Sequence, residues 1–170
     1  MALQFKYSKY FLLTLGMIVI DQVVKVWVHY NIVLGQSGEL KVFGDWFKLH
    51  YILNEGMAFG IQFGSDYGKL GLSLFRLVAM GVIAFYLYKM AKKGLPTGLL
   101  WCVALILGGA IGNVIDRIFY GAVADFLNMS CCGINNPYSF NIADIAIFMG
   151  AIGLAFFGED HKSKPKKNSA

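Results

Sequence analysis

Charged side chains are scarce in this chain, and their scarcity excludes an ordinary soluble protein. Asp, Glu, Lys and Arg make up 15% of the 170 residues, whereas hydrophobic residues make up 57%. So few charged residues cannot cover that much apolar surface with the polar surface that a soluble protein needs. The length indicates one domain, residues 1–170.

Cysteine and histidine are also too few and too scattered to indicate a metal site. The chain has three of each, and neither H-E-x-x-H nor a repeated C-x-x-C pattern occurs. We therefore expect no metal and no cofactor. Cys102 lies within an apolar run and is expected to be a packing residue. The adjacent Cys131 and Cys132 are assigned no role.

Four apolar runs predict a polytopic, mainly α-helical membrane protein. They cover about 11–29, 70–89, 97–118 and 141–158, each near the ~20 residues that a membrane-spanning helix needs. The first run is expected to be a retained helix, because Asp21-Gln22 interrupts its apolar stretch and no cleavage site follows.

The lysines predict the orientation of these helices. They gather before the first run, between the second and third, and in the basic tail 160–170, which is expected to be disordered. The positive-inside rule then places both termini in the cytoplasm and the loops about 31–69 and 119–140 outside. Lysines divided among three short segments form no basic face, so no nucleic-acid partner is expected.

The first external loop contains a strand pattern. From Trp46 onward, Phe47, Leu49, Tyr51 and Leu53 alternate with more polar positions, which is typical of a half-buried strand. Residues 57–61 are interpreted as a returning strand after Glu55-Gly56. We expect a small antiparallel sheet lying on the membrane surface.

Two aspartates lie where apolar runs meet the outer membrane face. Asp125 is expected near the end of the third helix and Asp144 at the start of the fourth. An ionised carboxylate is costly beside hydrocarbon, so two at one depth indicate a shared site. Small residues on the third and fourth runs predict close packing of these helices, which would draw the two aspartates together.

Other polar residues lie at the same membrane face or within the spans. Asp21 and Lys25 share one face of the first helix, four residues apart, and are expected to pair. The residues that gather near the outer face with the two aspartates are Asn54, Asn113, Asp116, Arg117 and Asn141. Their accumulation favours a functional polar site over two unrelated helix ends.

Five sequence blocks together resemble the lipoprotein signal peptidase family, also called signal peptidase II. The blocks are Asp21-Gln22-Val23-Val24-Lys25, Asn54-Glu55-Gly56-Met57-Ala58-Phe59, Gly112-Asn113-Val114-Ile115-Asp116-Arg117, Val123-Ala124-Asp125-Phe126 and Phe140-Asn141-Ile142-Ala143-Asp144. The resemblance spans about residues 11–158. It implies four transmembrane helices, a periplasmic β-sheet cradle and a short periplasmic helix, contributed by the second external loop.

The same resemblance implies a function. The family consists of aspartyl endopeptidases of the bacterial inner membrane, which cut prolipoproteins on the N-terminal side of a diacylglyceryl-modified cysteine. It implies Asp125 and Asp144 as the catalytic pair and globomycin as an inhibitor. Membrane lipids are expected neighbours, and a monomer is expected. Substrate-binding residues would be Asn54, Gly56, Asn113, Arg117 and Asn141, with Asp21, Lys25 and Asp116 in support.

Three other functions compete with this interpretation. A proton- or ion-coupled transporter would need polar residues throughout the depth of the bundle, but the inner halves of the last three spans are almost entirely apolar. A Ser–Lys peptidase would have to use Ser73 and Lys25, and Lys25 is already matched to Asp21. A non-catalytic assembly factor would use its charges only to hold helices together.

Overall fold

The computed structural model describes residues 2–35, 39–55, 66–130 and 136–163. It consists of four helices and three strands. The helices are α1 (Ala2–Asn31), α2 (Asp66–Lys92), α3 (Thr97–Tyr120) and α4 (Ile142–Ser163), and the strands are β1 (Leu40–Phe43), β2 (Phe47–Asn54) and β3 (Val123–Met129).

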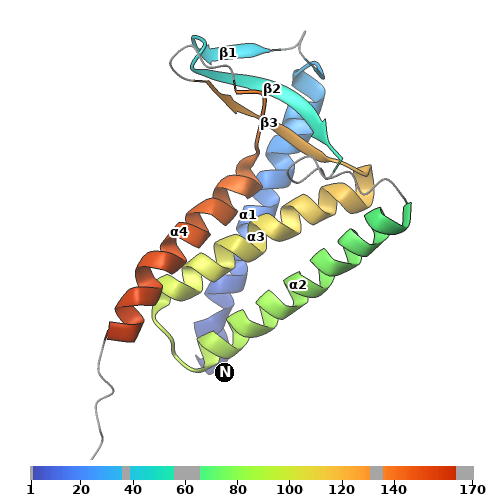
Figure 1. Cartoon of the computed structure of the whole chain (residues 1–170). Coiled ribbons are helices and arrows are strands. Elements are labelled where there is room, and N and C mark those ends of the chain that lie inside the picture. Colours follow the sequence, from blue (N-terminus) through green and yellow to red (C-terminus); the bar gives the residue numbers. More distant parts are fainter. Residues whose placement is uncertain (1, 36–38, 56–65, 131–135, 164–170) are drawn as a thin grey trace, which may run out of the picture.

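The third helix is the centre of the bundle, because α3 packs against α1, α2 and α4. The sheet crosses one end of the bundle, and α1 begins and α4 ends at the other (Figure 1). Buried apolar side chains of α1, α2 and α3, including Tyr10, Leu87 and Leu107, form the core at the end away from the sheet. A second cluster, around Val28 and Phe126, joins α1 to the sheet.

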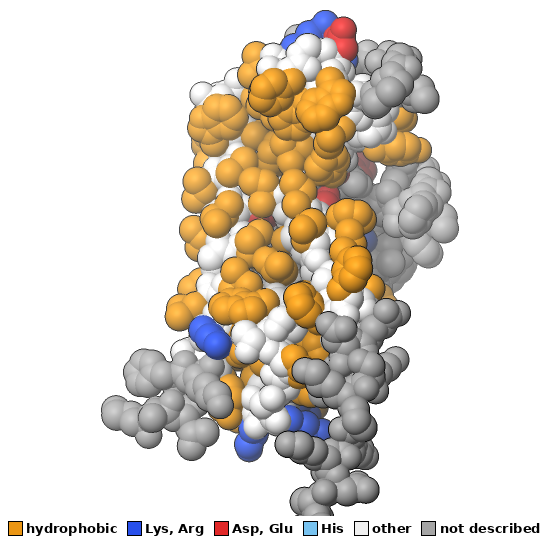
Figure 2. Space-filling view, turned by 90° about the vertical axis from the view of Figure 1, so that its left-hand side faces the viewer, with side chains coloured by type: hydrophobic (Ala, Val, Ile, Leu, Met, Phe, Trp, Pro, Cys, Tyr) orange, Lys and Arg blue, Asp and Glu red, His pale blue; other side chains and the backbone are white. Residues whose placement is uncertain are grey.

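The helices have the length and composition of membrane spans. Tyr7–Asn31, Leu74–Lys92 and Thr97–Tyr120 are long and apolar enough to cross a bilayer, and the apolar part of α4, Ile142–Gly158, is somewhat shorter. Apolar side chains cover the helices on the face drawn in Figure 2, and lysine or arginine side chains lie toward both ends of that face. The mainly helical fold with a small antiparallel sheet, expected from the sequence, is confirmed.

The partners of β2 differ from the predicted ones. The strand itself is confirmed, but it lies between β1 and β3, antiparallel to both. The predicted returning strand at 57–61 lies outside the described residues. A register shift between Leu49 and Ile52 interrupts the ladder to β3. Because such a bulge lets two residues oppose one, it bends β2 where the strand passes α1.

The prediction that Asp125 lies near the end of a helix was wrong. Gly121 has φ 77°, a left-handed conformation that glycine adopts without steric cost, and α3 stops at Tyr120. The chain then enters β3, and Asp125 pairs with Ile52 of β2. Residues 121–130 and 136–140 contain no helix, so the short periplasmic helix expected in this loop is absent from its described part. Residues 131–135 lie outside the described residues.

Small residues bring α3 and α4 into close contact, as predicted. A Cβ built on Gly109 would collide with the carbonyl oxygen of Ala143, and one on Gly150 would lie 2.7 Å from the carbonyl oxygen of Cys102. Gly108 instead faces α1, where a Cβ would lie 2.8 Å from Cβ of Met17. Gly108 and Gly109 therefore allow α1 and α4 to pack closely against α3. The contact between α3 and α4 places Asp144 near α3.

We predict that Gly109→Ala destabilises the protein. The added methyl group would meet backbone of α4 that cannot rotate away, so overpacking should cost about 1–3 kcal/mol and lower the thermal unfolding temperature in detergent. Gly81→Ala on α2 is the matched control, since nothing lies within 4 Å of its Cβ position. An equal loss of stability in both variants would contradict this account of the α3–α4 contact.

Candidate active site

A buried ion cluster joins α1 to α3. Lys25 Nζ lies 2.8 Å from Asp21 Oδ2, the pair predicted from the sequence, and also 2.8 Å from Asp116 Oδ2 of α3. All three side chains are at most 5% exposed. Gly112 makes the approach possible, because a Cβ there would lie 2.6 Å from Asp21 Oδ2. One ammonium group therefore serves two carboxylates inside the bundle.

The two carboxylates of this cluster also hold the backbone beside the predicted catalytic residues. Asp116 Oδ2 accepts a hydrogen bond from the backbone N–H of Ala124 at 3.3 Å, immediately before Asp125. Asp21 Oδ1 accepts one from the backbone N–H of Ala143 at 3.1 Å, immediately before Asp144. The cluster thus fixes the main chain of β3 and the first turn of α4 relative to each other.

Asp125 and Asp144 converge on Asn141. The Asn141 side-chain amide donates to Asp125 Oδ1 at 2.7 Å, and its backbone N–H donates to Asp144 Oδ2 at 3.1 Å. The backbone N–H of Asp144 donates in return to Asn141 Oδ1, which caps the N-terminus of α4. Asn113 Nδ2 of α3 donates to Asp144 Oδ1 at 2.8 Å. Each carboxyl group therefore accepts hydrogen bonds from neutral amides.

Two more predicted residues adjoin this pair, and one cannot be placed. Asn54 at the end of β2 donates from Nδ2 to Asp125 Oδ2 at 3.0 Å. Arg117 lies near Asp125 and Asp144, and its guanidinium donates to the backbone carbonyl of Asn113, while its buried Nε has no partner among the described residues. Gly56 lies outside the described residues.

Burial dominates the electrostatics of Asp125. The residue is 3% exposed, and loss of hydration, with a smaller contribution from the negative charge of Asp144, raises its pKa from 3.8 to about 6. Hydrogen bonds from Asn54 and Asn141 act in the opposite direction, because they stabilise the carboxylate. This carboxyl group therefore keeps a proton at a pH where an ordinary aspartate has lost it.

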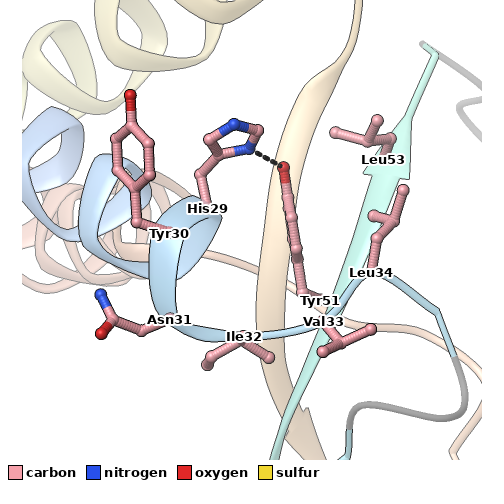
Figure 3. Close-up of a pocket in the computed structure, with 8 residues that line it drawn as sticks. All are labelled: His29, Tyr30, Asn31, Ile32, Val33, Leu34, Tyr51 and Leu53. Atoms are coloured by element: carbon pink, nitrogen blue, oxygen red, sulfur yellow. Dashed lines mark hydrogen bonds between the residues drawn. The ribbon is translucent and has the colours of Figure 1, made fainter.

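A separate pocket of about 370 Å³ lies between the end of α1 and β2 (Figure 3). It contains neither Asp125 nor Asp144. Inside it, the Tyr51 hydroxyl is hydrogen bonded to Nδ1 of His29 at 3.2 Å, which ties β2 to α1. Burial, with a smaller effect of the Asp116 charge, raises the pKa of Tyr51.

Gln22 is the site neighbour that sequence reasoning did not assign. Its Nε2 lies 2.9 Å from Asp116 Oδ1 and 3.2 Å from both Asp21 Oδ2 and the carbonyl oxygen of Gly112. The signal was its position, three residues before Lys25 on the same face of an apolar helix. Among the described residues, no group of three or more His, Cys, Asp or Glu side chains could hold a metal ion.

Comparison with known proteins gives a consistent result. The family described as Signal peptidase (SPase) II matches residues 13–158. A lipoprotein signal peptidase from Syntrophus aciditrophicus is 38% identical over 162 residues, covering 94% of this chain and 96% of the relative. One from Amoebophilus asiaticus is 49% identical over 119 residues, covering 69% of this chain and 50% of the relative. The match thus spans about half the length of some relatives, those from Porphyromonas gingivalis included.

A solved structure has the same fold. A bacterial membrane enzyme determined by the in meso method at 2.3 Å superposes with a TM-score of 0.73 and 25% sequence identity, covering 96% of this chain and 95% of that one. A second structure of this kind, determined at 1.9 Å, gives a TM-score of 0.71 at 23% identity.

We predict that Lys25→Met strongly destabilises the protein. Removal of the ammonium group leaves two buried carboxylates without a counter-charge, which should cost about 3–5 kcal/mol and lower the unfolding temperature. Lys41→Met is the matched control, because Lys41 and Asp45 form the same i,i+4 pair on the surface. It should lower the unfolding temperature far less, because solvent screens an exposed pair. Similar unfolding temperatures for both variants would contradict a structural role of the cluster.

We also predict a pH-dependent stability difference between the wild type and Asp125→Asn. Because the folded-state pKa of Asp125 is raised, its stabilising contribution is complete below about pH 4 and is lost as the pH rises through about 6. The free energy of unfolding of the variant, relative to that of the wild type, should therefore increase by up to about 3 kcal/mol between pH 4 and 7. Unfolding in detergent measures it.

Asp45→Asn provides a control of opposite sign. The side-chain hydrogen bond from Lys41 and its charge lower the pKa of Asp45, so the contribution of this exposed group is lost as the pH falls. A pH-independent difference between wild type and Asp125→Asn would contradict the raised pKa.

Proposed function

The chain belongs to the signal peptidase II family, and on this premise we propose that it is an aspartyl endopeptidase that cleaves diacylglyceryl-modified prolipoproteins. Cleavage occurs on the N-terminal side of the lipidated cysteine, and the two carboxyl groups of Asp125 and Asp144 activate the attacking water. No metal or cofactor takes part in this scheme.

The observation that carries the proposal is the meeting of two carboxyl groups at one residue. Asn141 donates its side-chain amide to Asp125 and its backbone N–H to Asp144, although these aspartates lie on different elements, β3 and α4. Two neighbouring carboxyl groups do not both ionise readily, so one retains a proton. A neutral acid beside an ionised base is what hydrolysis by an activated water requires.

The surroundings of the two aspartates support different roles for them. Asp144 lies in the first turn of α4, where the helix dipole favours negative charge, and both its oxygens accept hydrogen bonds. We assign it the role of general base. Asp125 is almost fully buried, and burial raises its pKa, so it holds a proton more readily than an ordinary aspartate and we assign it the role of general acid.

The reaction then proceeds in two steps. Asp144 takes a proton from water, the water oxygen bonds to the scissile carbonyl carbon, and Asp125 donates its proton to the carbonyl oxygen. The resulting tetrahedral diol collapses: the C–N bond breaks, the amine leaves with the proton held by Asp144, and a diol hydroxyl returns its proton to Asp125. Asn54, Asn113 and Asn141 orient the pair, and Arg117 and Gly56 are assigned to peptide binding.

The proposed orientation places this site at the periplasmic face of the bacterial inner membrane. Lys89, Lys92 and Lys93 lie at or beside the turn between α2 and α3, at the end of the bundle opposite the sheet. The positive-inside rule favours the cytoplasm for that end and for both chain termini. The acyl chains of the substrate would then remain in lipid beside the exposed apolar faces of the helices.

We predict that Asp125→Asn and Asp144→Asn each abolish cleavage without preventing folding. The measurement is cleavage of a diacylated prolipoprotein by purified protein in detergent, with wild type and Asp45→Asn as active controls and an unfolding curve for each variant. A decrease in kcat of at least about 10³-fold is expected, because the loss of the acid or the base removes a group that transfers protons in the transition state.

Three results would count against the proposed function. One is residual cleavage by a folded aspartate variant at near wild-type rate. Another is equal cleavage of lipidated and unlipidated substrate. The third is resistance of the wild-type reaction to globomycin, since family members are expected to bind it.

A further inference from the structure

We propose that Gln22 is a positioning residue for this reaction, and that it holds Asp21 and Asp116 in the geometry that fixes the two catalytic aspartates. The inference rests on the proposed function and adds to it a residue of α1 that does not itself touch the dyad. Gln22 lies within the membrane span Tyr7–Asn31 and is partly buried against α3.

The hydrogen-bond geometry of Gln22 is the first argument. Its Nε2 carries two hydrogens and lies within 3.2 Å of three oxygens: Asp116 Oδ1 at 2.9 Å, and Asp21 Oδ2 and the Gly112 carbonyl at 3.2 Å each. The contact with Asp116 is the shortest, and among the described residues Gln22 is the donor to that oxygen. Gln22 therefore bridges the two acidic residues of the ion cluster, one on its own helix and one on α3.

Charge balance is the second argument. Among the described residues, Lys25 is the cation in salt-bridge contact with Asp21 and Asp116, at 2.8 Å from each. Two buried carboxylates with one ammonium group leave one negative charge without a counter-charge, which is costly in a medium of low polarity. A neutral amide that donates to both carboxylates offsets part of this cost without adding charge.

The third argument is the route from Gln22 to the catalytic pair. Asp116 holds the N–H of Ala124 and Asp21 holds the N–H of Ala143, so each acid positions the residue before one catalytic aspartate. Lys25 Nζ also donates to Asn113 Oδ1 at 3.1 Å, and Asn113 donates to Asp144. A shift of Asp116 or Asp21 would therefore move Asp125 or Asp144 relative to the other.

Two substitutions at this position test the proposal by opposite pH responses. Gln22→Leu removes the donor at every pH, so kcat should fall on the order of 10- to 100-fold, with KM within about twofold of wild type. Gln22→Glu has the same shape, and in its protonated form it donates an O–H to Asp116. Its kcat should approach wild type at low pH and fall as the pH rises, because ionisation would place three carboxylates around one lysine.

Other ionisable groups do not obscure this response when the kcat and the unfolding temperature of each variant are divided by the wild-type values at the same pH. The groups that face the cluster are Asp21 and Lys25 from α1, Asp116 and Arg117 from α3, Asp125 from β3, Asp144 from α4 and Tyr51 from β2. All are present in both proteins. Asn31→Leu is the matched control, because it removes an amide of α1 whose hydrogen bond among the described residues goes to the Trp27 carbonyl at 2.7 Å, away from the cluster.

The unfolding temperature is measured over the same pH range as cleavage of the diacylated prolipoprotein. The proposal is supported if kcat and the unfolding temperature of Gln22→Glu, each relative to wild type, both fall as the pH rises. It would be overturned if these relative values did not change with pH, or if Gln22→Leu had the same kcat as Asn31→Leu. If Gln22→Leu fails to fold, the Gln22→Glu ratio alone decides. If the wild type cleaves no lipidated substrate, the proposed function fails, and the unfolding ratio still decides the role of Gln22.

Discussion

The fold around the site depends on one buried lysine shared by two aspartates. Charges inside a bundle cost several kcal/mol each unless partners surround them, so α1 and α3 are held at the depth and rotation that bring Lys25 to Asp21 and Asp116. The same carboxylates use their other lone pairs on the backbone of residues 124 and 143. The ion cluster therefore both orders the helices and sets the positions of Asp125 and Asp144, which we propose as the catalytic pair.

The proposed catalytic pair itself is held differently, by neutral amides. Asn54 and Asn141 donate to Asp125, while Asn113 and the backbone of Asn141 donate to Asp144. An amide fixes a carboxyl group in place and adds no net charge to the site. Burial can then raise the pKa of Asp125 to about 6, which a directly bonded cation would oppose. Separation of the lysine from the dyad by Asn113 is thus consistent with acid–base chemistry.

The route by which Asp125 reaches the site was only partly predictable. The convergence of Asp125 and Asp144 at one outer face followed from the positions of the apolar runs. The element that carries Asp125 did not, because a helix and a strand can place a carboxylate at the same depth. Gly121 ends α3, and pairing with β2 turns the next residues into β3. Strand partners depend on which edges meet in space, and no local pattern in 119–140 indicated β2 as the neighbour.

What the sequence determined by itself is local: the helical spans, from hydropathy, and the Asp21–Lys25 pair, from a four-residue spacing that one helix always brings together. Only the tertiary structure decided that Asp116 joins this pair, that Gln22 bridges it, and that Asn54 reaches Asp125 across 71 residues of chain. The reason is that such contacts depend on helix rotation and strand register. These are set by close packing at glycines such as Gly109 and Gly112, and by the pairing of β2 with β3.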